Sequence, residues 1–330
     1  MLLSLKVLSY LLGAALLILV ALVLVTMQPV LQKEVFMDGR ITVNPDTLQH
    51  YVYHLSEELP PRSGDVAHLN QSAEYIFDVL KAYSVDVSYQ LFEVDGITHK
   101  NIIATFGRRS EKCGTYIIGA HYDVWDGHPG ADDNASGIAG LLELARLFSE
   151  TDIDCPLQLV AYTLEEINTG RKHIGSYHHA QSMVDNAVRV EWMLSLEMIG
   201  YFSDEENSQA YPLSILNTLY PSKGNYIAFV GDLNQVGITR SIKAAFKGST
   251  DLPVYSINTT TRLSAITRSD HASYWAFNIP ALMVTDTSFN RNPNYHTAND
   301  TWDTLDYQRM AKVVEGVYYA TLFHTNSHTE

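Results

Sequence analysis

Along most of the chain, short apolar segments alternate with longer segments in which apolar residues recur at helical spacing. The segments with strand character are residues 85–94, 101–106, 115–120, 157–163, 189–196, 226–230 and 281–285. The segments with helical spacing are residues 48–59, 66–83, 135–149, 173–184, 233–247 and 305–323. Strands that alternate with helices predict an α/β fold, with a mainly parallel mixed sheet and helices on both of its faces.

The beginning of the chain follows a different pattern. Residues 7–25 carry no charge and are predominantly apolar. A helix of that length rises about 28 Å, close to the roughly 30 Å hydrocarbon core of a bilayer. The segment is longer than the apolar core of a secretory signal, and no Ala-x-Ala cleavage motif follows it. An uncleaved signal anchor is therefore favoured over a cleaved signal peptide and over a buried core helix.

The charges beside the apolar segment indicate its orientation. Lys6 precedes the segment, whereas Lys33 on the other side is offset by Glu34 and Asp38. The positive-inside rule then predicts a cytoplasmic N-terminus and places the rest of the chain outside the cytoplasm, in the periplasm, outside the cell or in a lumen. The expected organisation is a signal anchor or transmembrane helix over residues 1–27, a juxtamembrane linker over residues 28–46 and one domain over residues 47–330.

Composition excludes several classes of protein. Lys and Arg total 22 and Asp and Glu total 37, so the formal net charge is −15, and a nucleic-acid-binding protein with a basic face is excluded. Two cysteines cannot build a disulfide scaffold or a cysteine-based zinc site. Cys113 and Cys155 each precede a predicted strand, and they are candidates for one disulfide outside the cytoplasm.

Side chains of the kinds that bind metals follow three of the predicted strands. They are His121 and Asp123 after residues 115–120, Glu165 and Glu166 after residues 157–163, and Glu197 after residues 189–196. Two loops add Asp132, Asp133 and His296. Because ligands bind at the carboxyl ends of the strands in open α/β sheets, we expect these side chains to share one site.

Imidazole and carboxylate groups at such a site suit zinc. Two residues apart at a strand end, His121 and Asp123 point the same way, so the carboxylate of Asp123 is expected to accept the imidazole N–H. Of the adjacent Glu165 and Glu166, one is expected to bind metal and the other to act as general base.

The number of converging carboxylates indicates more than one metal ion. Asp133, Glu166 and Glu197 bring three negative charges, and Glu165 brings a fourth, so without metal they would repel one another. Two Zn²⁺ ions balance the group, and a bridging carboxylate and a bridging water would join ions about 3.5–4 Å apart.

Six segments, taken in order, resemble metallopeptidase family 28, which comprises co-catalytic zinc aminopeptidases and relatives that include glutaminyl cyclases. The segments are GAHYDVWDG, PGADDNASGIAGLLELA, YTLEEINTG, LSLEMIGY, RSDHASYW and NYHTANDT. The resemblance covers roughly residues 45–325 and implies a zinc-exopeptidase-like fold.

The resemblance also implies a role for each candidate residue. One zinc ion would be held by His121, Asp133 and Glu197, and the other by Asp133, Glu166 and His296. Glu165 would be the general base, and Asp123 would be the partner of His121. Glu197 departs from the family pattern, because several well-known members have Asp there. Met198 and Tyr295, which adjoin two of the ligands, are candidates for a substrate side-chain pocket.

The expected function is that of a membrane-anchored, extracytoplasmic, zinc-dependent exopeptidase that acts on peptides with a free N-terminus through a metal-activated water. Three alternatives remain at this point. One is an acyltransferase of the glutaminyl cyclase kind with one zinc ion. Another is a catalytically silent binding domain on the same fold. The third is an anchored carboxypeptidase that acts on acidic peptides.

Overall fold

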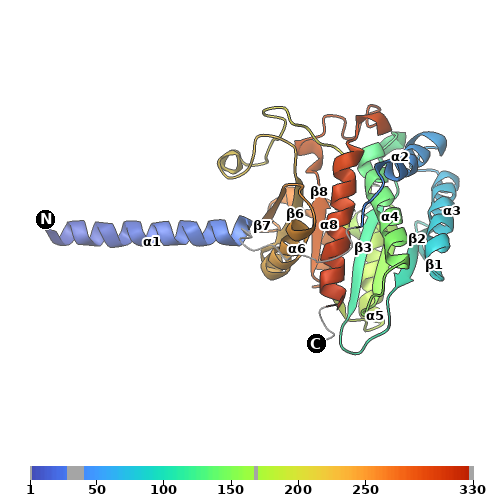
Figure 1. Ribbon diagram of the computed structural model, residues 1–330, viewed down its shortest axis with the longest axis horizontal. Helices are drawn as coiled ribbons and strands as arrows, with labels where there is room; N and C mark the ends of the chain where they lie inside the picture. The colour runs from blue at the N-terminus through green and yellow to red at the C-terminus, as the bar shows by residue number, and fades with distance from the viewer. Residues whose placement is uncertain (1, 28–40, 167–169, 327–330) are drawn as a thin grey trace.

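The computed structural model describes residues 2–27, 41–166 and 170–326. Within them, one eight-stranded sheet forms the centre of the molecule (Figure 1). Its strands are β1 (Asp86–Val94), β2 (Ile97–Phe106), β3 (Thr115–His121), β4 (Leu157–Tyr162), β5 (Val190–Glu197), β6 (Ile227–Asp232), β7 (Val254–Thr259) and β8 (Ala281–Thr285). Their order across the sheet is β1-β2-β4-β3-β5-β8-β6-β7.

Helices cover both faces of this sheet. They are α2 (Pro45–Tyr53), α3 (Val66–Tyr83), α4 (Gly137–Ser149), α5 (Gly175–Asp185), α6 (Val236–Ser249), α7 (His271–Trp275) and α8 (Tyr307–Asn326). The larger apolar core joins one face of the sheet to α2, α3, α4, α6 and α8, whereas α5 and α7 pack on the other face. This arrangement confirms the predicted fold class.

The sheet contains both parallel and antiparallel strand pairs, and its parallel strands bring several strand ends together. β3 pairs in parallel with β4 and with β5, and β5 pairs in parallel with β8. β1 and β2 form an antiparallel hairpin, and β6 joins β8 in antiparallel fashion. The carboxyl ends of β3, β4, β5 and β8 therefore lie along one edge of the sheet.

Most of the predicted elements occur close to their expected bounds, and α3 spans the predicted residues 66–83. The strand β7 was not predicted. Among the described strands it pairs with β6 alone, at the edge of the sheet. Most of its side chains are half-buried, and its sequence lacks the continuous apolar run of the central strands.

The two cysteines form a disulfide at the sheet edge opposite the strand ends just described. Cys113 precedes β3 and Cys155 precedes β4, and their Cα atoms lie 6.0 Å apart. This confirms the pairing that sequence analysis proposed.

The N-terminal apolar segment forms the helix α1 (Leu2–Met27), which projects away from the sheet beside β7 (Figure 1). It is long and apolar enough to cross a membrane, by length and composition only. Its last carbonyl, that of Met27, accepts hydrogen bonds from Nζ of Lys243 at 2.6 Å and from Oγ of Ser256 at 2.8 Å. Residues 28–40 of the predicted linker lie outside the described residues.

Candidate metal centre

The candidate ligands meet at the edge formed by four strand ends. His121 is the last residue of β3 and Glu197 the last of β5, Glu165 and Glu166 follow β4, Asp133 lies in a turn (Ala131–Ser136) before α4, and His296 lies in the loop after β8. Strands and turns far apart in the sequence thus deliver imidazole and carboxylate groups to one place, as sequence analysis predicted.

Two groups of three ligand-type side chains share one carboxylate. The first group is His121, Asp133 and Glu197, and the second is Asp133, Glu166 and His296. Nε2 of His121 lies 3.4 Å from Oδ1 of Asp133, and Nε2 of His296 lies 3.2 Å from its Oδ2. Each oxygen of Asp133 therefore faces a different histidine, which is the arrangement that a carboxylate bridging two metal ions requires.

The donor atoms are spaced as zinc ligands are. Two ligands about 2.0–2.1 Å from a tetrahedral zinc ion lie about 3.3–3.4 Å from each other. Nε2 of His121 lies 3.3 Å from Oε2 of Glu197 and 3.4 Å from Oδ1 of Asp133. That nitrogen and both carboxylate oxygens of Asp133 are buried without a hydrogen-bond partner among the described residues. Since buried polar atoms are nearly always paired, these atoms fit a bound metal ion.

The crowding of carboxylates displaces the pKa values of the cluster. Burial and the charge of Glu197 raise the pKa of Glu165, and burial and the charge of Asp133 raise the pKa of Glu166. Burial on its own lowers the pKa of His121, but Glu197 and the surrounding carboxylates outweigh burial and raise it well above its usual value. Without metal the cluster therefore holds protons, and bound cations would displace them.

Asp123 supports this cluster mainly by fixing the turn of the two glutamates. Its carboxylate accepts the N–H of Glu165 at 3.1 Å and the N–H of Glu166 at 2.9 Å. These bonds hold a turn that bends at Leu164, whose φ of 65° is rare for any residue except glycine. The Nδ1 atom of His121 lies 3.1 Å from the backbone carbonyl of Asp123 and 3.7 Å from its carboxylate. The main chain of Asp123 therefore makes the closer contact with the imidazole.

The turn that carries Asp133 is anchored by a distant carboxylate. The N–H groups of Asp132 and Asp133 donate to the two oxygens of Asp300 at 3.0 and 3.1 Å. Burial raises the pKa of Asp300 to about 8, against the lowering effect of these two hydrogen bonds.

Asn134 links that turn to the end of β5. Its Nδ2 donates to the carbonyl of Leu196 at 2.8 Å, and its Oδ1 accepts the N–H of Met198 at 3.1 Å. These two bonds bracket Glu197, whose carboxylate also accepts the hydroxyl of Ser269 at 2.8 Å. The longer side chain that replaces the usual Asp is therefore held at its base and at its tip.

Arg62 clamps the loop between His121 and Asp133. Its guanidinium is buried, with 1% exposure, and donates to the carbonyls of Leu55, Tyr122, Pro129 and Gly130. The contacts to Tyr122 and Gly130 are both 2.8 Å long. Burial lowers the pKa of Arg62 to about 10, so the side chain stays charged at neutral pH.

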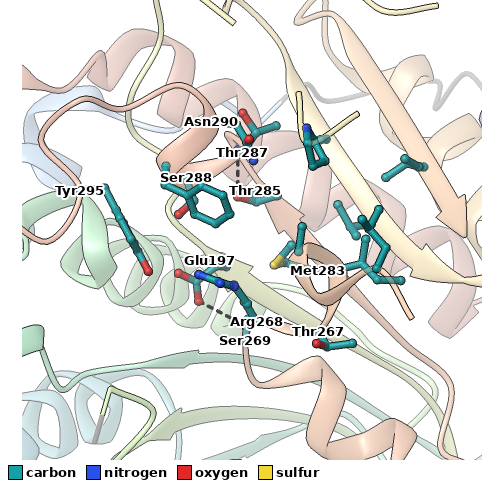
Figure 2. Close-up of a pocket in the computed structure, with 18 of the residues that line it drawn as sticks. Glu197, Thr267, Arg268, Ser269, Met283, Thr285, Thr287, Ser288, Asn290 and Tyr295 are labelled. Atoms are coloured by element: carbon teal, nitrogen blue, oxygen red, sulfur yellow. Dashed lines mark hydrogen bonds between the residues drawn. The ribbon is translucent and has the colours of Figure 1, made fainter. Parts of the chain in front are cut away.

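A cavity of about 670 Å³ opens beside the cluster, and Figure 2 shows Glu197 and Tyr295 facing it. The imidazole of His296 stacks between Trp125 and Tyr295, with ring centroids 4.8 and 3.8 Å away. Tyr295 lines the cavity, as sequence analysis expected, whereas Met198 is fully buried and is not among the lining residues. Met198 has a backbone φ of 51°, and its N–H donates to Oδ1 of Asn134.

Sequence analysis did not identify the supporting residues Arg62, Asn134 and Asp300. Asn134 and Asp300 stand in the motif segments beside candidate ligands, so their position was a usable signal. Arg62 follows two prolines and belongs to no pattern that points to the site.

Comparison with known sequences decides the family. The sequence profile of peptidase family M28 matches residues 101–321. The chain belongs to this family. An uncharacterized protein of Escherichia coli K12, YfbL, is 44% identical over 284 residues, which cover 83% of this chain and 86% of that protein. Leucine aminopeptidase 1 of Uncinocarpus reesii is 28% identical over 68% of this chain, which spans 55% of that protein's length.

Solved structures of the same fold include two kinds of enzyme. The zinc aminopeptidase of Bacillus subtilis superposes with a TM-score of 0.68 at 15% identity, over 87% of this chain and 96% of that one. The glutaminyl cyclase of Bacteroides thetaiotaomicron superposes with a TM-score of 0.65 at 17% identity, over 86% and 99%. At these identities the superpositions establish the fold, and the reaction has to be argued from the site.

Proposed function

We propose that the protein is a zinc-dependent aminopeptidase that removes residues from peptides with a free N-terminus. The observation that carries the proposal is that Asp133 belongs to two ligand groups, while Glu165 lies in a third group with His121 and Glu166. Membership of family M28 and the leucine aminopeptidase relatives support a peptide hydrolase.

In this proposal His121, Asp133 and Glu197 hold one zinc ion, and Asp133, Glu166 and His296 hold the other. Bound zinc would supply Lewis acidity to the scissile carbonyl and lower the pKa of an attacking water. The carboxylate of Glu165 takes a proton from that water and delivers it to the leaving amine. Asp123 keeps Glu165 in place through the backbone bond described above.

A substrate panel on one metal-quantified sample tests the proposal. We expect hydrolysis of aminoacyl amides and of unblocked peptides, none of N-blocked peptides, and about two zinc ions per chain. Activity and zinc content should fall together as the pH is lowered, because protons compete with zinc for the ligand side chains. Cyclisation of N-terminal glutamine with one zinc ion would instead identify a glutaminyl cyclase, and neither metal nor turnover would identify a silent binding domain.

We further propose that α1 anchors the protein in a membrane, with residues 28–46 as a linker and residues 47–330 as the peptidase domain outside the cytoplasm. The length and apolar character of α1 support the anchor. The Cys113–Cys155 disulfide supports an oxidising compartment.

Cell fractionation tests the anchor. The full-length chain should sediment with membranes, resist extraction by high salt and be released by detergent, because about 20 apolar residues are enough to span the bilayer. A variant that begins at residue 41 should be soluble and serves as the control. Recovery of the wild-type protein as a soluble form that starts near residue 28 would show that the segment is a cleaved signal.

A further inference from the structure

The cavity beside the metal cluster has a polar, charged part at the cluster and a mostly apolar part away from it. Away from the cluster the wall is mostly aromatic and aliphatic, with Tyr211, Leu216, Tyr220, Tyr226, Tyr255 and Ile257. The hydroxyls of Tyr211 and Tyr220 donate to the main-chain carbonyls of Pro221 and Ser256, at 2.6 and 2.7 Å. These hydroxyls are thus occupied, and the rings offer mainly carbon surface to a ligand.

Two arginine side chains contribute positive charge to the lining of this cavity. Among the described lining residues, Arg171 and Arg268 are the two with permanently cationic side chains. The negative lining residues are those of the metal cluster, whose charge two zinc ions would balance. A negatively charged group on a substrate therefore finds a complementary charge at Arg171 or Arg268.

Arg268 is held in position from its backbone to its tip. The next residue, Ser269, donates its hydroxyl to Glu197, which fixes the main chain beside the cluster. The guanidinium of Arg268 lies 5.1 Å from the ring centroid of Phe289, whose ring lies 5.6 Å from that of Tyr295. Figure 2 shows the side chain of Arg268 extended beside Glu197.

Arg171 reinforces this segment from the other side. It donates to the carbonyl of Thr267 at 3.1 Å, so it is tied to the residue that precedes Arg268. Both arginines are exposed, and in the part of the chain that the structure describes neither forms an ion pair with a carboxylate.

Some other arginines of this acidic chain have carboxylate partners, whereas others, such as Arg240 and Arg262, have none among the described residues and lie outside the cavity lining. Arg146 lies 2.7 Å from Glu143, and Arg189 lies 2.7 Å from Glu191. A guanidinium that faces an apolar cavity without such a partner is suited to bind a carboxylate, since its planar donors match the two oxygens and it is weakly hydrated.

We propose that Arg268, supported by Arg171, binds a carboxylate of the substrate, so that the enzyme prefers peptides that carry one close to the scissile bond. This inference rests on the proposed aminopeptidase function. The carboxylate has two sources, the side chain of an N-terminal Asp or Glu and the terminal carboxylate of a dipeptide. A basic N-terminal residue is disfavoured, because like charges would meet at Arg268.

Two substrate pairs, assayed with the full-length zinc-loaded protein, separate these sources. The first pair is the p-nitroanilides of Glu and Gln, which differ in side-chain charge and little in shape. The second pair is Leu-Gly and Leu-Gly-amide, which differ in the terminal carboxylate. We expect the wild type to favour the carboxylate member of one pair, and the responding pair identifies the source.

Replacing the arginine then tests its role. Arg268→Gln should lower kcat/KM for the favoured member about 10- to 100-fold, the value of a charge-assisted hydrogen bond, and leave its neutral counterpart unchanged. Arg268→Lys should restore part of the preference. Arg262→Gln removes the same charge from an exposed position outside the cavity lining and should leave the ratio unchanged.

Two outcomes would overturn the inference: a wild type that favours the carboxylate member of neither pair, or an Arg268→Gln variant whose ratio equals that of the wild type in both pairs. If the wild type hydrolyses Leu-Gly-amide while either outcome is seen, the aminopeptidase proposal stands and only the role of Arg268 is wrong. If no compound is hydrolysed, the proposed function is wrong. Calorimetric binding of the same four compounds to the wild type and to Arg268→Gln then decides the carboxylate preference without turnover.

Discussion

Glu165→Gln is expected to lower kcat at least about 10²-fold while zinc content stays at the wild-type value. Glutamine keeps the size of the side chain and its hydrogen-bonding atoms but cannot accept the proton of the attacking water, and general-base catalysis contributes about 10²–10⁴-fold. Since Asp123 holds the backbone N–H of this residue, the substitution leaves the turn in place. The measurements are steady-state kinetics and metal analysis on the same preparation.

Glu166→Gln is the matched comparison, because Asp123 holds its backbone in the same way. Its Oε1 lies 2.9 Å from Nε2 of His296, within the second ligand group. Loss of that negative ligand should weaken zinc binding first, and excess zinc should restore part of the activity. Glu150→Gln, at an exposed position, should change neither property.

The roles of the two glutamates would have to be exchanged if Glu165→Gln lost zinc while Glu166→Gln kept both ions without activity. If neither substitution changed turnover, the reacting atoms would lie somewhere else.

Arg62→Met is expected to lower the free energy of unfolding by about 3–5 kcal/mol. The substitution keeps the length of the side chain but leaves four carbonyls, three of them buried, without their charged donor. Each buried bond of this kind contributes about 1.5–3 kcal/mol before the loop relaxes. For a domain of this size that corresponds to a fall in Tm of roughly 5–8 °C. Because the released loop joins His121 to Asp133, zinc affinity should fall as well.

Chemical denaturation with and without a chelator measures both effects. Arg108→Met is the control, since Arg108 lies at the surface beside Asp152 and such pairs contribute about 0–1 kcal/mol. An Arg62→Met protein that unfolds at the same denaturant concentration as the wild type would show that water replaces the guanidinium at those carbonyls.

Local pattern was enough to predict the fold class and the meeting of the candidate ligands. Parallel strands share one carboxyl edge, so the residues that follow β3, β4 and β5 meet whatever loops connect them. The same reasoning could not identify β7, because its sequence, VYSINT, is neither continuously apolar nor regularly alternating. Whether such a segment forms a strand depends on the neighbouring strand with which it pairs, and the segment's own sequence does not describe that neighbour.

The contacts made by the supporting residues could not be predicted for a different reason, although Asn134 and Asp300 stand beside candidate ligands in the sequence. Asp300 binds the backbone of Asp133 from 167 residues away, and Asn134 binds Met198 from 64 residues away. Such contacts depend on the relative placement of complete elements, which spacing within a motif does not specify. Asp123 shows the same limit, because its residue type predicted a contact with the imidazole, whereas its carboxylate mainly binds the glutamate turn.

The bond between Ser256 and the last carbonyl of α1 has a consequence for how substrate arrives. Ser256 also lines the cavity, so the end of the apolar helix touches the wall of the chamber where peptides would be cut. With α1 in a bilayer, the cavity would stay close to the lipid surface. A peptide tethered to the same membrane would then encounter the enzyme at a high effective concentration, as two linked binding partners do. A free peptide would have to diffuse in from bulk solution, so the anchor itself would bias cleavage towards chains that emerge from the membrane.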